Sequence, residues 1–246
     1  MTETGHTGES ARARRIRANL DAVRERIATA CAKAGRPADD VTIIAVTKTF
    51  PASDVRILAD LGVLDVGENR DQEASPKADH CRDLPLTWHF VGQLQTNKAR
   101  SVARYADVVH SVDRERLVRA LGARSRVENR TLECLVQVNL DTESAPGVIG
   151  PRGGADPRDA MAVADAIAAE DGLELGGVMA VAPRQGDPAE AFERLYAVAQ
   201  AVRGRYPRAK VVSAGMSRDL EAAIEQGATH VRLGAALLDD RGPNVG

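Results

Sequence analysis

A repeated alternation of short apolar segments with helix-forming segments constrains the fold of this chain more than any other feature. Strands are expected at 43–46, 63–67, 86–92, 107–111, 132–139, 174–180, 209–214 and 229–233, each followed by a helix. Alternating strand–helix units joined by right-handed crossovers build a parallel sheet. Eight such units in 246 residues most simply close a (β/α)8 TIM barrel. An open, doubly wound sheet is the alternative, but no GxGxxG motif follows the first strand.

A further helix is expected ahead of the barrel, between Ser10 and Ala34. Its apolar side chains recur at helical spacing and form one stripe: Ile16, Leu20, Val23, Ile27 and Cys31. This helix must pack outside the barrel that follows. Residues 1–9 are expected to be a disordered tail, and residues 10–246 a single domain. The glycine-containing segment Asp141–Asp156 is expected to be a mobile lid or an insertion.

Capping residues predict where several helices begin and end. Ser217 is expected to cap the helix after the seventh strand, and Gly122 to close the helix after the fourth. Pro157 and Pro188 are each expected at the first position of a helix, the second behind an Asp187 cap.

Composition argues against several classes of protein. The formal net charge is −2, so nothing calls for a nucleic-acid partner. No stretch is long and apolar enough to span a membrane, and the N-terminus has no signal-peptide pattern. Cys31, Cys81 and Cys134 are odd in number and lack CxxC spacing, which indicates a reducing compartment and a cytoplasmic protein. Without paired His or Cys spacing, no metal site is expected.

Lys48 stands at the carboxyl end of the first strand, where Pro51 prevents the strand from continuing. The chain has only five lysines, so a lysine at a strand end is not one of many surface charges. A lysine with a neutral amine can form a Schiff base with an aldehyde. The alternative is that Lys48 only caps the strand and reaches out to water.

Small and hydroxyl-bearing residues follow the seventh and eighth strands, where barrels often bind phosphate. They are Ser213-Ala214-Gly215-Met216-Ser217 and Gly234-Ala235-Ala236. In a closed barrel the first strand neighbours the eighth, so Lys48 would lie beside this anion site. A Schiff-base lysine next to a phosphate cradle is the layout that pyridoxal phosphate requires. The alternative is an ordinary loop followed by a helix cap.

Arg232, Asn69 and His89 lie in or at the ends of strands. A buried arginine needs a partner, and the candidates for Arg232 are the aromatic nitrogen of a cofactor or a carboxylate such as Glu68. Because a guanidinium only donates hydrogen bonds, it would hold a pyridine nitrogen unprotonated and weaken the ring as an electron sink. A histidine such as His89, within a strand, is more often a core residue than a functional one.

Several stretches resemble the YggS/PROSC family of pyridoxal-phosphate-binding proteins. These are AVTKTF, GENR, WHFVGQLQTNK, GGVMAVAP and SAGMSRDLEAAIEQGATHVRLG, in this order, and the resemblance runs from Val41 to Leu238. It implies a single barrel like the N-terminal domain of alanine racemase, which holds pyridoxal phosphate as a Schiff base without established catalytic turnover.

The resemblance also implies the roles of individual residues. Lys48 would be the Schiff-base lysine and Asn69 a neighbour of the cofactor, with His89 also assigned to the site. Met216, Ser217, Gly234 and Ala235 would hold the phosphate, and Arg232 would contact the pyridine nitrogen. The family usually has threonine or serine at the position of Ala235, so a hydroxyl contact to the phosphate is missing. A short family motif after the fifth strand is replaced by the loop that ends at Arg152-Gly153-Gly154.

Three functions follow from these residues. The first is intracellular storage, buffering or delivery of pyridoxal phosphate, with apo-enzymes as partners and a monomer or weak dimer as the assembly. The second is an amino-acid racemase, which would need a second base, yet Tyr105, Tyr196 and Tyr206 fall in or at the ends of expected helices. The third is a cofactor-free Schiff-base aldolase, which would need an acid–base pair near Lys48. The first is the function that the sequence favours.

Overall fold

The computed structural model describes residues 10–141 and 153–239. Within them eight parallel strands close into a barrel, each strand paired with the strands before and after it in sequence, and β8 paired with β1. The strands are β1 (Thr42–Val46), β2 (Asp65–Glu68), β3 (Thr87–Phe90), β4 (Val108–Val112), β5 (Leu132–Gln137), β6 (Leu173–Met179), β7 (Val211–Ser213) and β8 (His230–Leu233). The predicted (β/α)8 barrel is confirmed.

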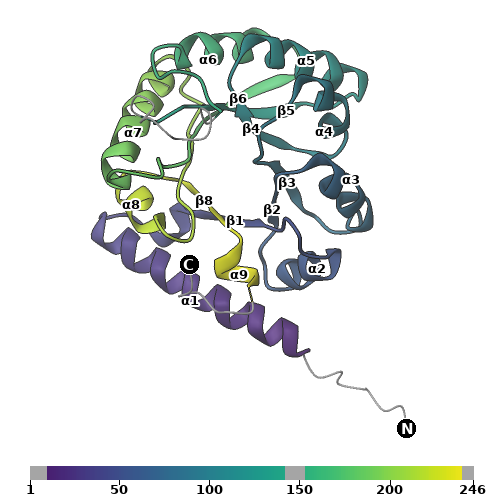
Figure 1. The fold of residues 1–246 in the computed structure, drawn as a ribbon, viewed down its shortest axis with the longest axis vertical. Coiled ribbons are helices and arrows are strands. Elements are labelled where there is room, and N and C mark those ends of the chain that lie inside the picture. Colours follow the sequence, from purple (N-terminus) through teal and green to yellow (C-terminus); the bar gives the residue numbers. More distant parts are fainter. Residues whose placement is uncertain (1–9, 142–152, 240–246) are drawn as a thin grey trace.

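Helices surround the strands (Figure 1). They are α1 (Ala11–Lys33), α2 (Ala52–Asp60), α3 (Asp71–His80), α4 (Ala99–Tyr105), α5 (Glu115–Val127), α6 (Ala160–Ala169), α7 (Pro188–Arg205), α8 (Leu220–Glu225) and α9 (Ala235–Leu238), with 3-10 turns η1 (Ala38–Asp40) and η2 (Thr96–Lys98). None of the helices in the described ranges is both long and apolar enough to cross a bilayer. The predicted tail at 1–9 and most of the predicted loop at 141–156 lie outside the described residues.

The N-terminal helix α1 packs against α8 and α9, on the outside of the β8–β1 junction (Figure 1). Ser10 caps it by accepting a hydrogen bond from the Ala13 amide, and all five residues of the predicted stripe are buried. A buried polar contact fixes its position, because the Asn19 side-chain amide donates to the Leu237 carbonyl oxygen at 3.0 Å. The extra helix is therefore part of the folded unit.

Some predicted helix ends were wrong. Gly122 lies inside α5, where a Cβ atom would come within 2.3 Å of the Glu170 side chain. This glycine allows two helices to approach, and it does not end the helix. Helix α6 begins three residues after Pro157, whereas α7 begins at Pro188, with Asp187 accepting from the Ala189 amide as predicted.

The barrel interior combines apolar and polar side chains. Val108, Leu135 and Met179 pack together there. His110 is fully buried, and burial lowers its pKa well below the usual range. Burial also lowers the pKa of His230 to about 4; His89 adds to this shift and Asp65 opposes it. Both histidines are therefore neutral in the folded protein at neutral pH.

Because the pKa values of His110 and His230 are lowered in the folded protein, we predict that the protein loses stability on acidification below neutral pH. The pKa of His230 is lower in the folded chain than in the unfolded chain, where it is near 6.5, so the unfolded state binds more protons between pH 6.5 and 4. From pH 7.5 to pH 5, His230 alone should lower the free energy of unfolding by about 2 kcal/mol. Urea unfolding at both pH values should show a smaller loss for His230→Gln than for wild type. Exposed His80→Gln is the matched control, and equal losses in wild type and His230→Gln would contradict the prediction.

Candidate functional site

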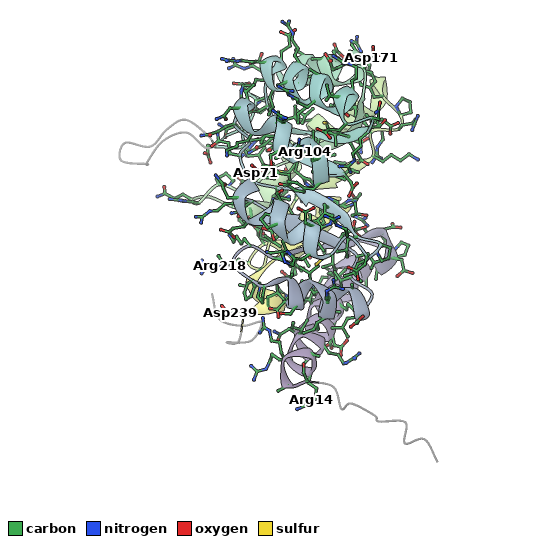
Figure 2. The ribbon with its side chains drawn as sticks, turned by 90° about the vertical axis from the view of Figure 1, so that its right-hand side faces the viewer. Arg14, Asp71, Arg104, Asp171, Arg218 and Asp239 are labelled. Carbon is green, nitrogen blue, oxygen red and sulfur yellow. The ribbon has the colours of Figure 1, made fainter. Side chains whose placement is uncertain are left out.

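The carboxyl edge of the barrel brings the predicted site residues together. Ala45 of β1 pairs with Leu233 of β8, and Val46 pairs with Gly67 of β2. Lys48, two residues after β1, therefore lies between the loops that follow β8 and β2. Figure 2 shows Arg218, from the loop after β7, and Asp239, from the end of α9, on the same side of the molecule.

Lys48 occupies an exposed turn, whereas Thr47 directly before it is fully buried. Within the described ranges, the Lys48 ammonium has no hydrogen bond and no ion pair. Its neighbours are held instead: the Thr47 amide donates to the Gly67 carbonyl oxygen at 2.9 Å, and the Thr49 amide donates to a Glu73 carboxylate oxygen at 3.1 Å. The strand end is thus fixed while the amine is available to a ligand.

A buried ion pair that the sequence analysis missed lies beside this turn. Lys77 of α3 donates to Glu68 at 2.5 Å and to the Thr47 carbonyl oxygen at 2.7 Å. The Thr47 hydroxyl donates to the same Glu68 oxygen at 2.6 Å. The scarcity of lysine could have pointed to Lys77. The chain has five lysines, and the sequence analysis gave a role only to Lys48.

The loop after β7 is shaped by Gly215 and by α1. Gly215 adopts a φ of +91°, and a Cβ atom there would lie 2.7 Å from Ala223. Arg26 of α1 donates to the Ser217 carbonyl oxygen at 2.9 Å. The prediction that Ser217 caps α8 was wrong, because Asp219 holds the N-cap position and accepts from the Met216 amide at 2.6 Å. Ser217 is therefore not needed as a cap.

Backbone amides at the two predicted phosphate loops point to an anion. Among the described residues, the amides of Ser217, Ala235 and Ala236 have no hydrogen-bond acceptor. Gly234 lets the second loop approach β1, since a Cβ atom there would lie 3.1 Å from the Val46 carbonyl oxygen. Unpaired amides in adjacent loops suit the oxygens of a phosphate group.

Arg232 is almost fully buried, with 5 % of its surface exposed. It donates to the Ser213 hydroxyl at 2.7 Å and to the Ala180 carbonyl oxygen at 2.8 Å. The alternative in which Glu68 pairs with Arg232 was wrong, because Glu68 binds Lys77. Burial lowers the pKa of Arg232 to about 10, so it is a cation at neutral pH.

Behind Arg232, a line of hydrogen bonds that we call the interior chain crosses the barrel. Ser213 contacts His110 Nδ1 at 3.0 Å, His110 Nε2 contacts His89 Nδ1 at 2.9 Å, and His89 Nε2 contacts Asp65 at 2.9 Å. Arg232 can only donate and the Asp65 carboxylate can only accept, so the pattern that pairs every member has the Ser213 hydroxyl donate to His110. In the same pattern His110 donates to His89, and His89 donates to Asp65. Every donor in the interior chain has an acceptor.

The structure places Asn69 and His89 differently with respect to the site. Asn69 follows β2, and a buried side-chain oxygen of this residue has no partner in the described part of the chain. Gly92 packs on its backbone, where a Cβ atom would lie 2.1 Å from the Asn69 carbonyl oxygen. Both ring nitrogens of His89 are bound to protein, so His89 supports Arg232 from behind through the interior chain. A direct contact between His89 and a cofactor stays a prediction.

These groups together fit a phosphorylated aromatic aldehyde. Lys48 offers an amine, the loops after β7 and β8 offer unpaired amides, and Arg232 offers further N–H donors. No cluster of three or more metal-ligating side chains is found between residues 10 and 141 or 153 and 239. Tyr105 ends α4 with its hydroxyl buried, and Tyr196 and Tyr206 lie in and just after α7.

Comparison with known proteins agrees with this fit. Residues 18–241 match the family described as alanine racemase, N-terminal domain. The chain is 44 % identical to a Mycobacterium bovis protein and 37 % identical to an Escherichia coli K12 protein, both called pyridoxal phosphate homeostasis protein. These alignments cover 90 % and 91 % of this chain, and 91 % and 95 % of the two relatives.

A solved structure of a similar protein contains the cofactor. PipY of Synechococcus elongatus, solved with PLP (pyridoxal phosphate) bound, superposes with a TM-score of 0.75 at 30 % identity. The superposition covers 91 % of this chain and 99 % of PipY. Fold, sequence and site geometry agree, and the chain belongs to the family of pyridoxal phosphate homeostasis proteins.

Proposed function

We propose that this protein binds pyridoxal phosphate as a Schiff base on Lys48 and stores, buffers or delivers it within the cell. The observation that carries the proposal is the unpaired Lys48 amine beside two loops with unpaired amides. The names of the relatives and the bound PipY structure support it. When bound, pyridoxal phosphate supplies an aldehyde for the lysine and an aromatic ring that can accept electrons.

The phosphate is assigned to the amides of the two loops, with Met216 and Ser217 on one side and Gly234 and Ala235 on the other. Only Ser217 contributes a hydroxyl, because alanine occupies position 235. Asn69, with its unpartnered side-chain oxygen, is assigned to the cofactor's edge. Amides that need no other partner compensate for the missing hydroxyl.

Arg232 favours binding over catalysis. It is assigned to the pyridine nitrogen, and since a guanidinium donates hydrogen bonds and cannot accept one from a pyridinium N–H, it keeps the nitrogen unprotonated. The Ser213 hydroxyl behind Arg232 is already engaged with Arg232 and His110, so the interior chain brings no acid to the ring nitrogen. A carrier needs tight binding and no carbanion chemistry, which fits this arrangement.

Racemisation is the second candidate function, since the chain shares the alanine racemase N-terminal domain. It requires a second base opposite Lys48. Tyr105, the buried tyrosine of α4, has a pKa raised first by burial and then by Asp71 and Glu68, so it is a poor base. We therefore propose a protein without turnover, located in the cytoplasm, with apo-enzymes as the receivers of the cofactor.

The first test is the visible absorbance of purified protein, wild type beside Lys48→Ala. We expect a Schiff-base band in the wild type that is absent from the variant, and borohydride reduction should fix the cofactor on the Lys48 peptide. Exposed Lys33→Ala, at the end of α1, is the matched control. A colourless wild type that takes up no added pyridoxal phosphate would refute the proposal.

Ser213→Ala should loosen the cofactor without moving it from Lys48. The substitution removes the acceptor between Arg232 and His110, and a lost hydrogen bond of about 1 kcal/mol weakens affinity about fivefold. Equilibrium dialysis with pyridoxal phosphate measures this change. Ser111→Ala is the control, because that serine is equally buried but its hydroxyl has no partner in the described residues. Equal affinities in the two variants would count against the role of the interior chain.

Turnover is tested by incubating the loaded protein with L-alanine and with D-alanine and following chirality. We expect neither isomer to convert, because Tyr105, Tyr196 and Tyr206 lie in or just after helices α4 and α7 and not at strand ends. Conversion that disappears in Lys48→Ala would instead establish the racemase function.

A further inference from the structure

The residue after Lys48 has an unfavourable backbone conformation. Thr49 adopts a φ of +66°, in the left-handed region. A β-branched side chain is rare there because its Cβ substituents crowd the backbone. Such a conformation persists only where surrounding contacts hold it, and it occurs most often at functional sites.

Helix α3 contacts the backbone on both sides of Lys48. Glu73 accepts from the Thr49 amide at 3.1 Å, and Lys77 donates to the Thr47 carbonyl oxygen at 2.7 Å. Glu73 and Lys77 are four residues apart, so they share one face of the helix. Both contacts are made to backbone atoms, and Lys48 itself is left untouched.

The helix is anchored firmly enough to act as a support. Ala74, between the two contact residues, is fully buried, and the Lys77 ammonium is fixed by Glu68, which also accepts from the Thr47 hydroxyl. Glu73 is about one-third exposed, so its contact to Thr49 is not a by-product of core packing.

We propose that Glu73 and Lys77 are positioning residues, which clamp residues 47–49 in the strained turn that presents the Lys48 amine to the cofactor. The inference rests on the proposed function of Lys48. The clamp holds the turn before the cofactor arrives, so Lys48 meets the aldehyde without first ordering its own backbone. The Thr49 amide is also the main reason that the pKa of Glu73 lies below its usual value.

The test compares apo proteins by hydrogen exchange and by the rate at which added pyridoxal phosphate forms the Schiff-base band. In Glu73→Ala, the loss of a hydrogen bond to a charged acceptor should speed exchange of the Thr49 amide and slow cofactor uptake, each about tenfold. Glu73→Gln keeps an oxygen acceptor and should stay near wild type. Asp79→Ala is the control, since Asp79 is an exposed acid on the same helix that pairs with Arg82.

A glycine at position 49 separates positioning from general stability. Glycine adopts positive φ without strain, so Thr49→Gly combined with Glu73→Ala should recover most of the lost uptake rate. The contact between Lys77 and the Thr47 carbonyl oxygen is tested in the double variant Lys77→Met with Glu68→Gln. Replacing both partners leaves no unpaired buried charge, and the variant should also take up the cofactor more slowly.

Each outcome decides the proposal. Wild-type uptake in Glu73→Ala, or no recovery on adding Thr49→Gly to a folded protein, would overturn the clamp. If wild type takes up no cofactor, the proposed function fails, and unchanged Thr49 exchange in Glu73→Ala would show separately that the clamp is absent.

Discussion

The pairing of β8 with β1 is the contact on which the rest of the structure depends. It converts a row of strand–helix units into a closed ring, so that none of the eight described strands has an unpaired edge. It also brings the loops after β7 and β8, which come late in the chain, beside Lys48, which comes early. Helix α1 covers this junction, and through Arg26 and Asn19 it holds both the loop after β7 and helix α9. The β8–β1 pairing therefore both closes the barrel and brings the residues of the candidate site together.

Polar side chains inside the barrel carry a second constraint. The interior chain runs from a carboxylate at the amino end of β2 to the guanidinium of Arg232, through groups that are each both donor and acceptor. The direction of donation follows from both ends, an arginine that can only donate and a carboxylate that can only accept. These hydrogen bonds fix the orientation of the Arg232 guanidinium, whereas the side chain of an arginine on a surface loop would be free to move.

The sequence alone predicted the barrel, the α1 stripe and the location of Lys48 and Arg232, because each depends on local periodicity or on a strand end. Sequence-based prediction failed where the structural role of a residue depends on a neighbour that is distant in the sequence. Gly122 looks like a helix end until Glu170 is seen against it. Lys77 and Glu73 lie on a polar helix whose pattern resembles any solvated surface, and only the β1 turn gives them a role. For the same reason, Glu68 was considered only as an alternative partner for Arg232, whereas it binds Lys77.

The contacts of α1 also set an order of events during folding. Asn19 and Leu237 are 218 positions apart, and Arg26 and Ser217 are 191 apart, so α1 has partners that are synthesised long after it. Contacts of such separation form late and slow the search for the native state. A nascent chain therefore carries an exposed apolar stripe on α1 until α8 and α9 have been made. The cofactor site becomes competent only at the moment the ring closes.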